Sequence, residues 1–187
     1  MVEESTYQEL KTYLEEGNFL TQDIREMAQN PEVIPDLMTL ALSNDEPAAW
    51  RAAWALSHAM KDSVDWLVPY LPQVVEVLPS IKKDGHVREL LKFYRDIDIT
   101  LIPDDLHGKL YDYCFSLFEN NSLQPGTRSN AFRVLLKIVE TEPLLIGEVK
   151  AAFDMIAPFL SKGIRSSCQR RINQIEFQSI NESKNEI

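Results

Sequence analysis

Five side chains suited to binding a partner recur along the chain at nearly constant spacing. Trp50 and Trp54 lie four residues apart, so a helix would carry both on one side. Phe93, Arg133 and Arg170 follow Trp54 at intervals of 39, 40 and 37 residues. Aromatic and arginine side chains supply much of the binding energy at protein interfaces. We expect these residues to form a groove that the tryptophans open and the arginines continue. The alternative is that both tryptophans pack against neighbouring helices.

A basic run lies near the end of the chain. It contains Lys162, Arg165, Arg170 and Arg171, and no acidic residue occurs between positions 161 and 175. Such a run can hold an acidic peptide, a phosphate, or the acidic end of a second copy of the chain. The simpler interpretation is a solvated face with one arginine bonded to a neighbouring turn.

Other groups that could do chemistry have simpler explanations. Asp104, Asp105 and His107 resemble metal ligands, but the carboxylates directly follow Pro103 at a predicted helix start, where they cap backbone amides. Cys114 and Cys168 do not have the spacing of zinc ligands, and we expect both to be buried free thiols. The sequence has neither a glycine-rich phosphate loop nor a Gly-x-Ser-x-Gly elbow. We therefore predict no catalytic residue, no metal and no cofactor.

The elements that position these residues repeat with a period of about forty residues. Ala49, Arg88, Arg128 and Arg165 mark equivalent points, 39, 40 and 37 residues apart. Around each point, apolar or small residues occupy one stripe of a helix. The four stripes are Ala48, Ala52, Leu56, Ala59; Val87, Leu91, Tyr94, Ile97; Thr127, Ala131, Leu135, Ile138; and Ile164, Cys168, Ile172, Ile175. A helical repeat of this length is typical of an α-solenoid.

Turn signals divide the chain into helices. The predicted helices are 6–16, ended by Gly17-Asn18, and 22–29, then the pairs 31–43 and 47–61, 68–82 and 86–97, 104–119 and 126–141, and 147–161 and 163–176. We predict one domain over residues 1–178, with an acidic cap at 1–30 and the four pairs at 31–176. Residues 179–187 are polar, and we predict a disordered tail there.

The pairs resemble HEAT repeats. In that family the first helix carries a proline before a leucine-rich stretch, an acidic turn follows, and a Val-Arg pair opens the second helix. The chain shows Leu71-Pro72, Asp84 and Val87-Arg88 in one unit, Ile34-Pro35-Asp36-Leu37 with Asp45 in another, and Thr127-Arg128 and Ile164-Arg165 in the later two. It departs from the pattern at Ala49, which replaces the arginine, and in the third and fourth units, which lack the turn aspartate.

The resemblance implies an all-α, right-handed α-solenoid of about four helix pairs preceded by capping helices. It also implies a scaffold or adaptor that binds a protein or peptide on its concave face without catalysis. One alternative is a DNA-related HEAT-like protein of the alkylation-repair type, with Trp50, Trp54 and Asp96 at the damaged base. Glu89 and Asp96 in the expected groove disfavour it, because DNA requires a basic lining. A second alternative is an all-helical enzyme of another kind.

Charge and hydropathy narrow the class of partner. The formal net charge is −10. Residues 1–46 carry eleven acids and two bases, a net charge of −9, whereas residues 161–187 carry five bases and three acids, a net charge of +2. An acidic chain makes nucleic acid an improbable partner. There is no apolar run of eighteen residues and no signal-peptide pattern, so we expect no membrane partner and a cytoplasmic protein.

Overall fold

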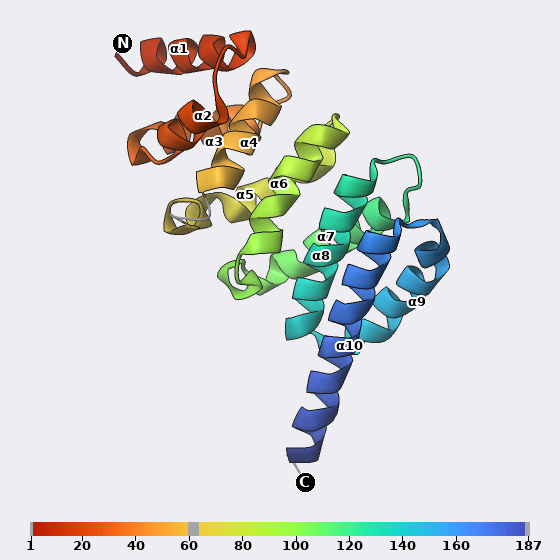
Figure 1. The fold of residues 1–187 in the computed structure, drawn as a ribbon. Helices are drawn as coiled ribbons and strands as arrows, with labels where there is room; N and C mark the ends of the chain where they lie inside the picture. Colours follow the sequence, from red (N-terminus) through yellow and green to blue (C-terminus); the bar gives the residue numbers. More distant parts are fainter. Residues whose placement is uncertain (1, 60–63, 186–187) are drawn as a thin grey trace. The chain divides into compact units, whose positions relative to one another are not determined.

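The computed structural model describes residues 2–59 and 64–185, and it consists of helices and their connections (Figure 1). Those residues contain no β-strand. None of their helices has the length and apolar character needed to cross a bilayer. The chain divides into two compact units, one reaching Ile97 and including Leu101–Pro103, the other comprising Asp98–Thr100 and the residues from Asp104 onward. The single domain over 1–178 therefore stays a prediction.

The described residues of the first unit form six α-helices, some of which are flanked by short 3-10 turns. They are α1 (Val2–Glu16), α2 (Thr21–Ala28), η1 (Pro31–Val33), α3 (Ile34–Ala41), α4 (Ala48–Ala59), η2 (Val64–Trp66), η3 (Val68–Tyr70), α5 (Leu71–Val77), η4 (Leu78–Ser80) and α6 (Asp84–Asp96). After η5 (Ile99–Leu101), the second unit contains α7 (Asp104–Glu119), α8 (Pro125–Thr141), η6 (Pro143–Leu145), α9 (Ile146–Ile156), η7 (Ala157–Phe159) and α10 (Lys162–Asn185).

Each predicted helix pair has a counterpart in the structure. The second helices are continuous, whereas three of the first helices, α3, α5 and α9, are flanked by 3-10 turns. Prolines explain the difference, because a proline lacks the backbone N–H that the preceding turn of an α-helix needs. Pro35 and Pro72 lie in the first turns of α3 and α5, and Pro158 lies at the start of η7.

The predicted apolar stripes form the core. Fifteen of the sixteen stripe residues are buried, and Ile164 at the start of α10 is half-buried. Two second helices are central to the units that contain them: α4 packs against α1, α2, α3 and α6, and α8 packs against α7, α9 and α10. Six buried alanines on α4 leave room for neighbours on several sides: Ala48, Ala49, Ala52, Ala53, Ala55 and Ala59.

An arginine of α4 holds the end of α1. The Arg51 Nη1 donates to the Leu14 carbonyl oxygen at 2.5 Å and to the Glu15 carbonyl oxygen at 2.9 Å. These are carbonyls of the last turn of α1, which have no partner within the helix. Gly17 then turns the chain with φ of +71°, as predicted, and a Cβ at this position would lie 2.7 Å from Arg51 Nη1. Gly17 therefore provides both the left-handed backbone and the space for the guanidinium.

The disordered tail predicted for residues 179–187 is wrong as far as the structure describes it. The last helix, α10, continues to Asn185, and residues 186–187 lie outside the described residues. No glycine or proline follows Gly163, so no residue with a strong helix-breaking preference interrupts the helix.

We expect Gly17→Ala to lower the free energy of unfolding by about 1–2 kcal/mol, because an L-residue in this conformation is strained and its methyl group would displace Arg51. Gly85→Ala in α6 is the control in the same unit, since a Cβ there meets nothing within 4 Å. It should raise stability by about 0.4–1 kcal/mol. Urea denaturation followed by circular dichroism measures both changes, and equal effects would contradict the role assigned to Gly17.

Candidate functional site

The two tryptophans of α4 are half-buried, and other side chains hold both rings. The Arg51 guanidinium carbon lies 5.6 Å from the Trp50 ring centroid and 5.8 Å from that of Phe19, distances typical of cation–π contacts. The Trp54 ring meets His58 edge-on, with ring centroids 5.2 Å apart and planes at 83°. Each ring therefore packs on one side and keeps part of its surface accessible.

Trp50 lines an open pocket of about 220 Å³ between α4 and the start of α6. The other lining residues are Lys83, Gly85, His86 and Arg88. We call this the Trp50 pocket. Its volume is below the 300–1,000 Å³ of typical small-molecule sites, so it has room for about one side chain. The first turn of α6 adds the partial positive charge of a helix N-terminus.

A buried histidine forms the floor of the Trp50 pocket. The His86 side chain is fully buried; its Nδ1 lies 3.0 Å from Glu46 Oε1 and its Nε2 lies 2.8 Å from the Ala41 carbonyl oxygen. The two ring nitrogens therefore tie the start of α6 to the end of α3 and to Glu46 in the following turn. Lys83 Nζ lies 3.8 Å from Glu46 Oε2 at the rim, and its side chain is 60% exposed.

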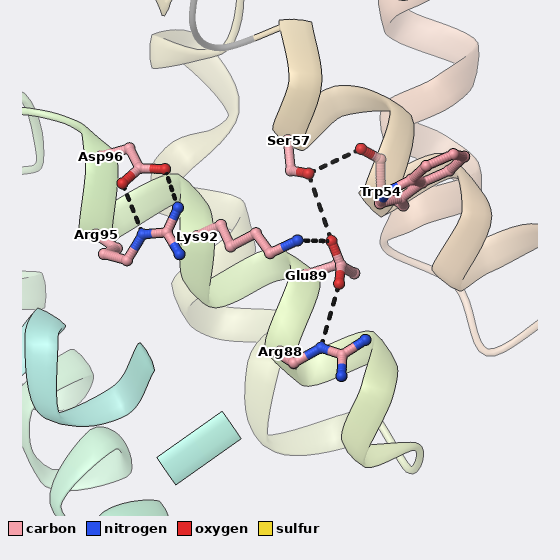
Figure 2. A network of polar contacts seen from close by, with 7 residues as sticks. All are labelled: Trp54, Ser57, Arg88, Glu89, Lys92, Arg95 and Asp96. Atoms are coloured by element: carbon pink, nitrogen blue, oxygen red, sulfur yellow. Dashed lines mark hydrogen bonds and ion pairs between the residues drawn. The ribbon is translucent and has the colours of Figure 1, made fainter. Parts of the chain in front are cut away.

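A buried carboxylate lies on the next turn of α6. Figure 2 shows the Glu89 carboxylate between Ser57 of α4 and two cationic side chains of α6. Glu89 Oε2 accepts from Lys92 Nζ and lies 3.4 Å from Ser57 Oγ, and Oε1 lies 3.3 Å from Arg88 Nε. The Ser57 hydroxyl also lies 2.8 Å from the Trp54 carbonyl oxygen. Because Glu89 is 2% exposed, these partners replace the water that its charge has lost.

The network and the pocket share Arg88. Its Nε faces Glu89, while the residue also lines the Trp50 pocket. The network therefore holds a pocket cation in place. An arrangement of aromatic surface, held cations and a helix N-terminus can bind a carboxylate group, and the buried Glu89 is too enclosed to react with a ligand.

A HEAT repeat domain model matches residues 6–175, which is most of the chain. This protein belongs to the HEAT repeat family. No curated protein and no solved structure gives a significant match. The family confirms the resemblance drawn from the repeat spacing and makes the chain a helical repeat scaffold of the α-solenoid kind.

The structure contradicts the groove prediction at one residue. Phe93 was expected on an open surface, but its side chain is fully buried in α6. Glu89, which was also expected in the groove, is buried as well. The groove prediction assumed that each second helix buries only its core stripe, whereas α6 packs against α4 and also bonds α5 through the Tyr94 hydroxyl and the Leu71 carbonyl oxygen.

The two arginines of the predicted groove lie in the second of the two compact units. Arg133 of α8 and Arg170 of α10 are exposed. Arg133 is close enough to Cys168 of α10 for its charge to act on the thiol. The tryptophans lie in the first unit, so a groove that joins all four residues stays a prediction.

The basic run divides between two environments. Lys162, Arg165 and Arg170 are exposed, whereas Arg171 pairs with Glu140 of α8. Another repeat arginine bonds a neighbouring helix: Arg128 Nε donates to the Phe118 carbonyl oxygen at 2.9 Å, near the end of α7. Burial lowers the pKa of Arg128.

The three residues considered as metal ligands lie in the first turn of α7. Asp104 and Asp105 begin the helix, and His107 is buried with Nε2 3.1 Å from the Ile99 carbonyl oxygen. Among the described residues, no three or more His, Cys, Asp or Glu side chains are grouped to hold a metal ion. Asp96, the acid of the DNA-repair alternative, pairs with the adjacent Arg95 through Nε at 2.6 Å.

Sequence reasoning missed Lys83, Gly85 and His86 as a site. Lys83 and Gly85 lie between the predicted helices 68–82 and 86–97, and His86 begins the second of them, so none was given a functional role. The available signal was the repeat itself. Trp50 directly follows the reference point Ala49, and Arg88 is the reference point of the next repeat. Stacking of consecutive repeats therefore brings the two residues together.

We expect Glu89→Gln to lower the free energy of unfolding by about 1–3 kcal/mol, because hydrogen bonds to charged groups stabilise by about that amount and the new amide adds a donor among donors. The exposed Glu32 provides a control: Glu32→Gln should change stability by less than about 0.5 kcal/mol. Denaturant titration of the two variants decides the point, and an unchanged Glu89→Gln midpoint would show that the network contributes nothing.

Both cysteines are free and buried, as predicted. Burial raises the pKa of Cys168 to about 11, with Arg133 partly opposing the shift, and burial also raises the pKa of Cys114. Because the thiolate is the reactive form, we expect both to react with an aromatic disulfide reagent at pH 8 at least about 100-fold more slowly in the folded than in the denatured protein. A rapid reaction of either thiol in the folded chain would contradict the burial.

Proposed function

We propose that this protein is a non-catalytic adaptor that binds a peptide segment of a partner protein at the Trp50 pocket. The pocket would receive one acidic side chain of the segment, with its carboxylate near Lys83 and its stem against the Trp50 ring. The observation that carries the proposal is the conjunction of an aromatic wall, two cations and a helix N-terminus around a space for one side chain.

Three features support a peptide over a small molecule. HEAT repeats are helical scaffolds, and the pocket is open and small. Trp54 lies one turn after Trp50 on α4, so it extends the accessible aromatic surface beyond the pocket. A chain lying along α4 would place successive side chains on these two rings, which is how aromatic anchors contribute to interfaces. The buried polar side chains beside the pocket, His86 and Glu89, already have partners and would serve as support.

The test is selection from a displayed library of random peptides, followed by titration of the selected sequences. We expect acidic peptides to be enriched. Trp50→Ala should weaken their binding at least about tenfold, because it removes a binding hot spot. Lys83→Ala should weaken it about threefold, because an exposed ion pair contributes less. Added salt should weaken the wild-type complex, since the ion pair is screened.

Two matched variants control for nonspecific effects. Lys82→Ala removes the neighbouring exposed lysine, which does not line the pocket, and Trp66→Ala removes a half-buried tryptophan of η2. Circular dichroism checks that each variant folds. Enrichment of no peptide class, or an equal loss for Lys82→Ala and Lys83→Ala, would contradict the proposed site.

A further inference from the structure

The outer face of α1 is acidic and carries an aromatic side chain. Leu10 and Leu14 are buried, which places Glu9, Tyr13 and Glu16 on the opposite side at helical spacing. These three residues, with Gln8 and Thr12, line a hollow of about 440 Å³. Tyr13 is 37% exposed within it.

Lys11 is the one basic residue of α1, and it pairs with carboxylates outside this face. Lys11 Nζ lies 2.8 Å from Asp45 Oδ2 and 3.9 Å from Glu15 Oε1, so its charge is already paired. Burial and the charge of Asp23 raise the pKa of Tyr13, which keeps its hydroxyl protonated. The hollow on α1 therefore suits a cationic side chain accompanied by an apolar one.

The outer face of α10 has the opposite character. Cys168, Ile172 and Ile175 are buried, and the exposed stripe is Ser166, Arg170, Asn173 and Phe177, at intervals of four, three and four residues. Arg165 and Lys162 are exposed in the first turn of the same helix. Phe177 is 66% exposed, so this face also offers an aromatic side chain.

From these two faces we propose that copies of this chain associate head to tail, with α10 of one copy docking in the α1 hollow of the next. The occupant is a second copy because the chain itself supplies the complementary charge. Residues 1–46 carry a net charge of −9 and residues 161–187 a net charge of +2. Each face also offers an exposed aromatic ring, Tyr13 on α1 and Phe177 on α10.

The charges also determine the type of symmetry. Two α1 faces repel each other, and so do two stretches of Lys162, Arg165 and Arg170, so neither face matches itself. The contact is therefore heterologous, because each copy carries one face of each kind. Arg171 takes no part, because Glu140 of its own chain already holds it.

The test begins with sedimentation of the full chain over a range of concentrations. We expect the average mass to rise above the monomer mass as concentration increases in 0.1 M salt. In 1 M salt the dissociation constant should rise at least about tenfold, because the Debye length falls from about 10 Å to about 3 Å. A monomer at every concentration up to about 0.5 mM would overturn the proposal.

Two neutralised variants then identify the faces. The first is Glu9→Gln with Glu16→Gln, and the second is Arg165→Gln with Arg170→Gln. Each alone should remain monomeric. Mixed together they keep one intact face of each kind, so they should form a one-to-one dimer that does not grow further. Failure of the mixture to dimerise, or growth beyond a dimer, would overturn the head-to-tail arrangement.

A third pair of substitutions controls for the loss of positive charge in general. Lys109→Gln with Lys137→Gln removes two lysines of α7 and α8 and should leave association unchanged. Phe177→Ser should weaken association at high and low salt alike, since it removes the apolar part of the contact. Weakening by the lysine control equal to that of the arginine variant would show that the effect is not specific to α10.

Discussion

The packing of this protein follows from one constraint: the central helices α4 and α8 must each bury more than one side. Helix α4 contacts four other helices of its unit and α8 contacts three, so little of either surface remains for water. The composition of α4 meets this constraint with six buried alanines, which allow neighbours to approach closely without overpacking. A longer apolar side chain at such a position would force the neighbouring helices apart.

The same constraint places the candidate site at the junction of α4 and α6. Trp50 and Trp54 are too large for the tight contacts of the alanines, and they lie where α4 is only partly covered. The start of α6 meets α4 beside Trp50, and this brings a helix N-terminus and its cations to the aromatic surface. The pocket is thus a product of helix packing, supported below by His86 and its two acceptors.

Charged side chains of the first unit form hydrogen bonds that connect its helices. Arg51 joins α4 to the last turn of α1, and Glu89 joins α6 to Ser57 of α4. Each tie satisfies a polar group that folding has removed from water, which is why its loss should cost stability.

The sequence alone determined the helix pairs, the turns between them and the core stripes. These follow from local preferences and from a period of about forty residues, as the prolines in the first turns of α3 and α5 and the glycine after α1 show. Tertiary structure decided which residues of the opposite face are buried, because burial on a second side depends on a neighbouring helix. Phe93 lies in the core and Trp50 at a pocket rim although both occupy the predicted groove face of a second helix. Lys83 and Arg88 join Trp50 for the same reason: residues of consecutive repeats become neighbours only when the helices stack.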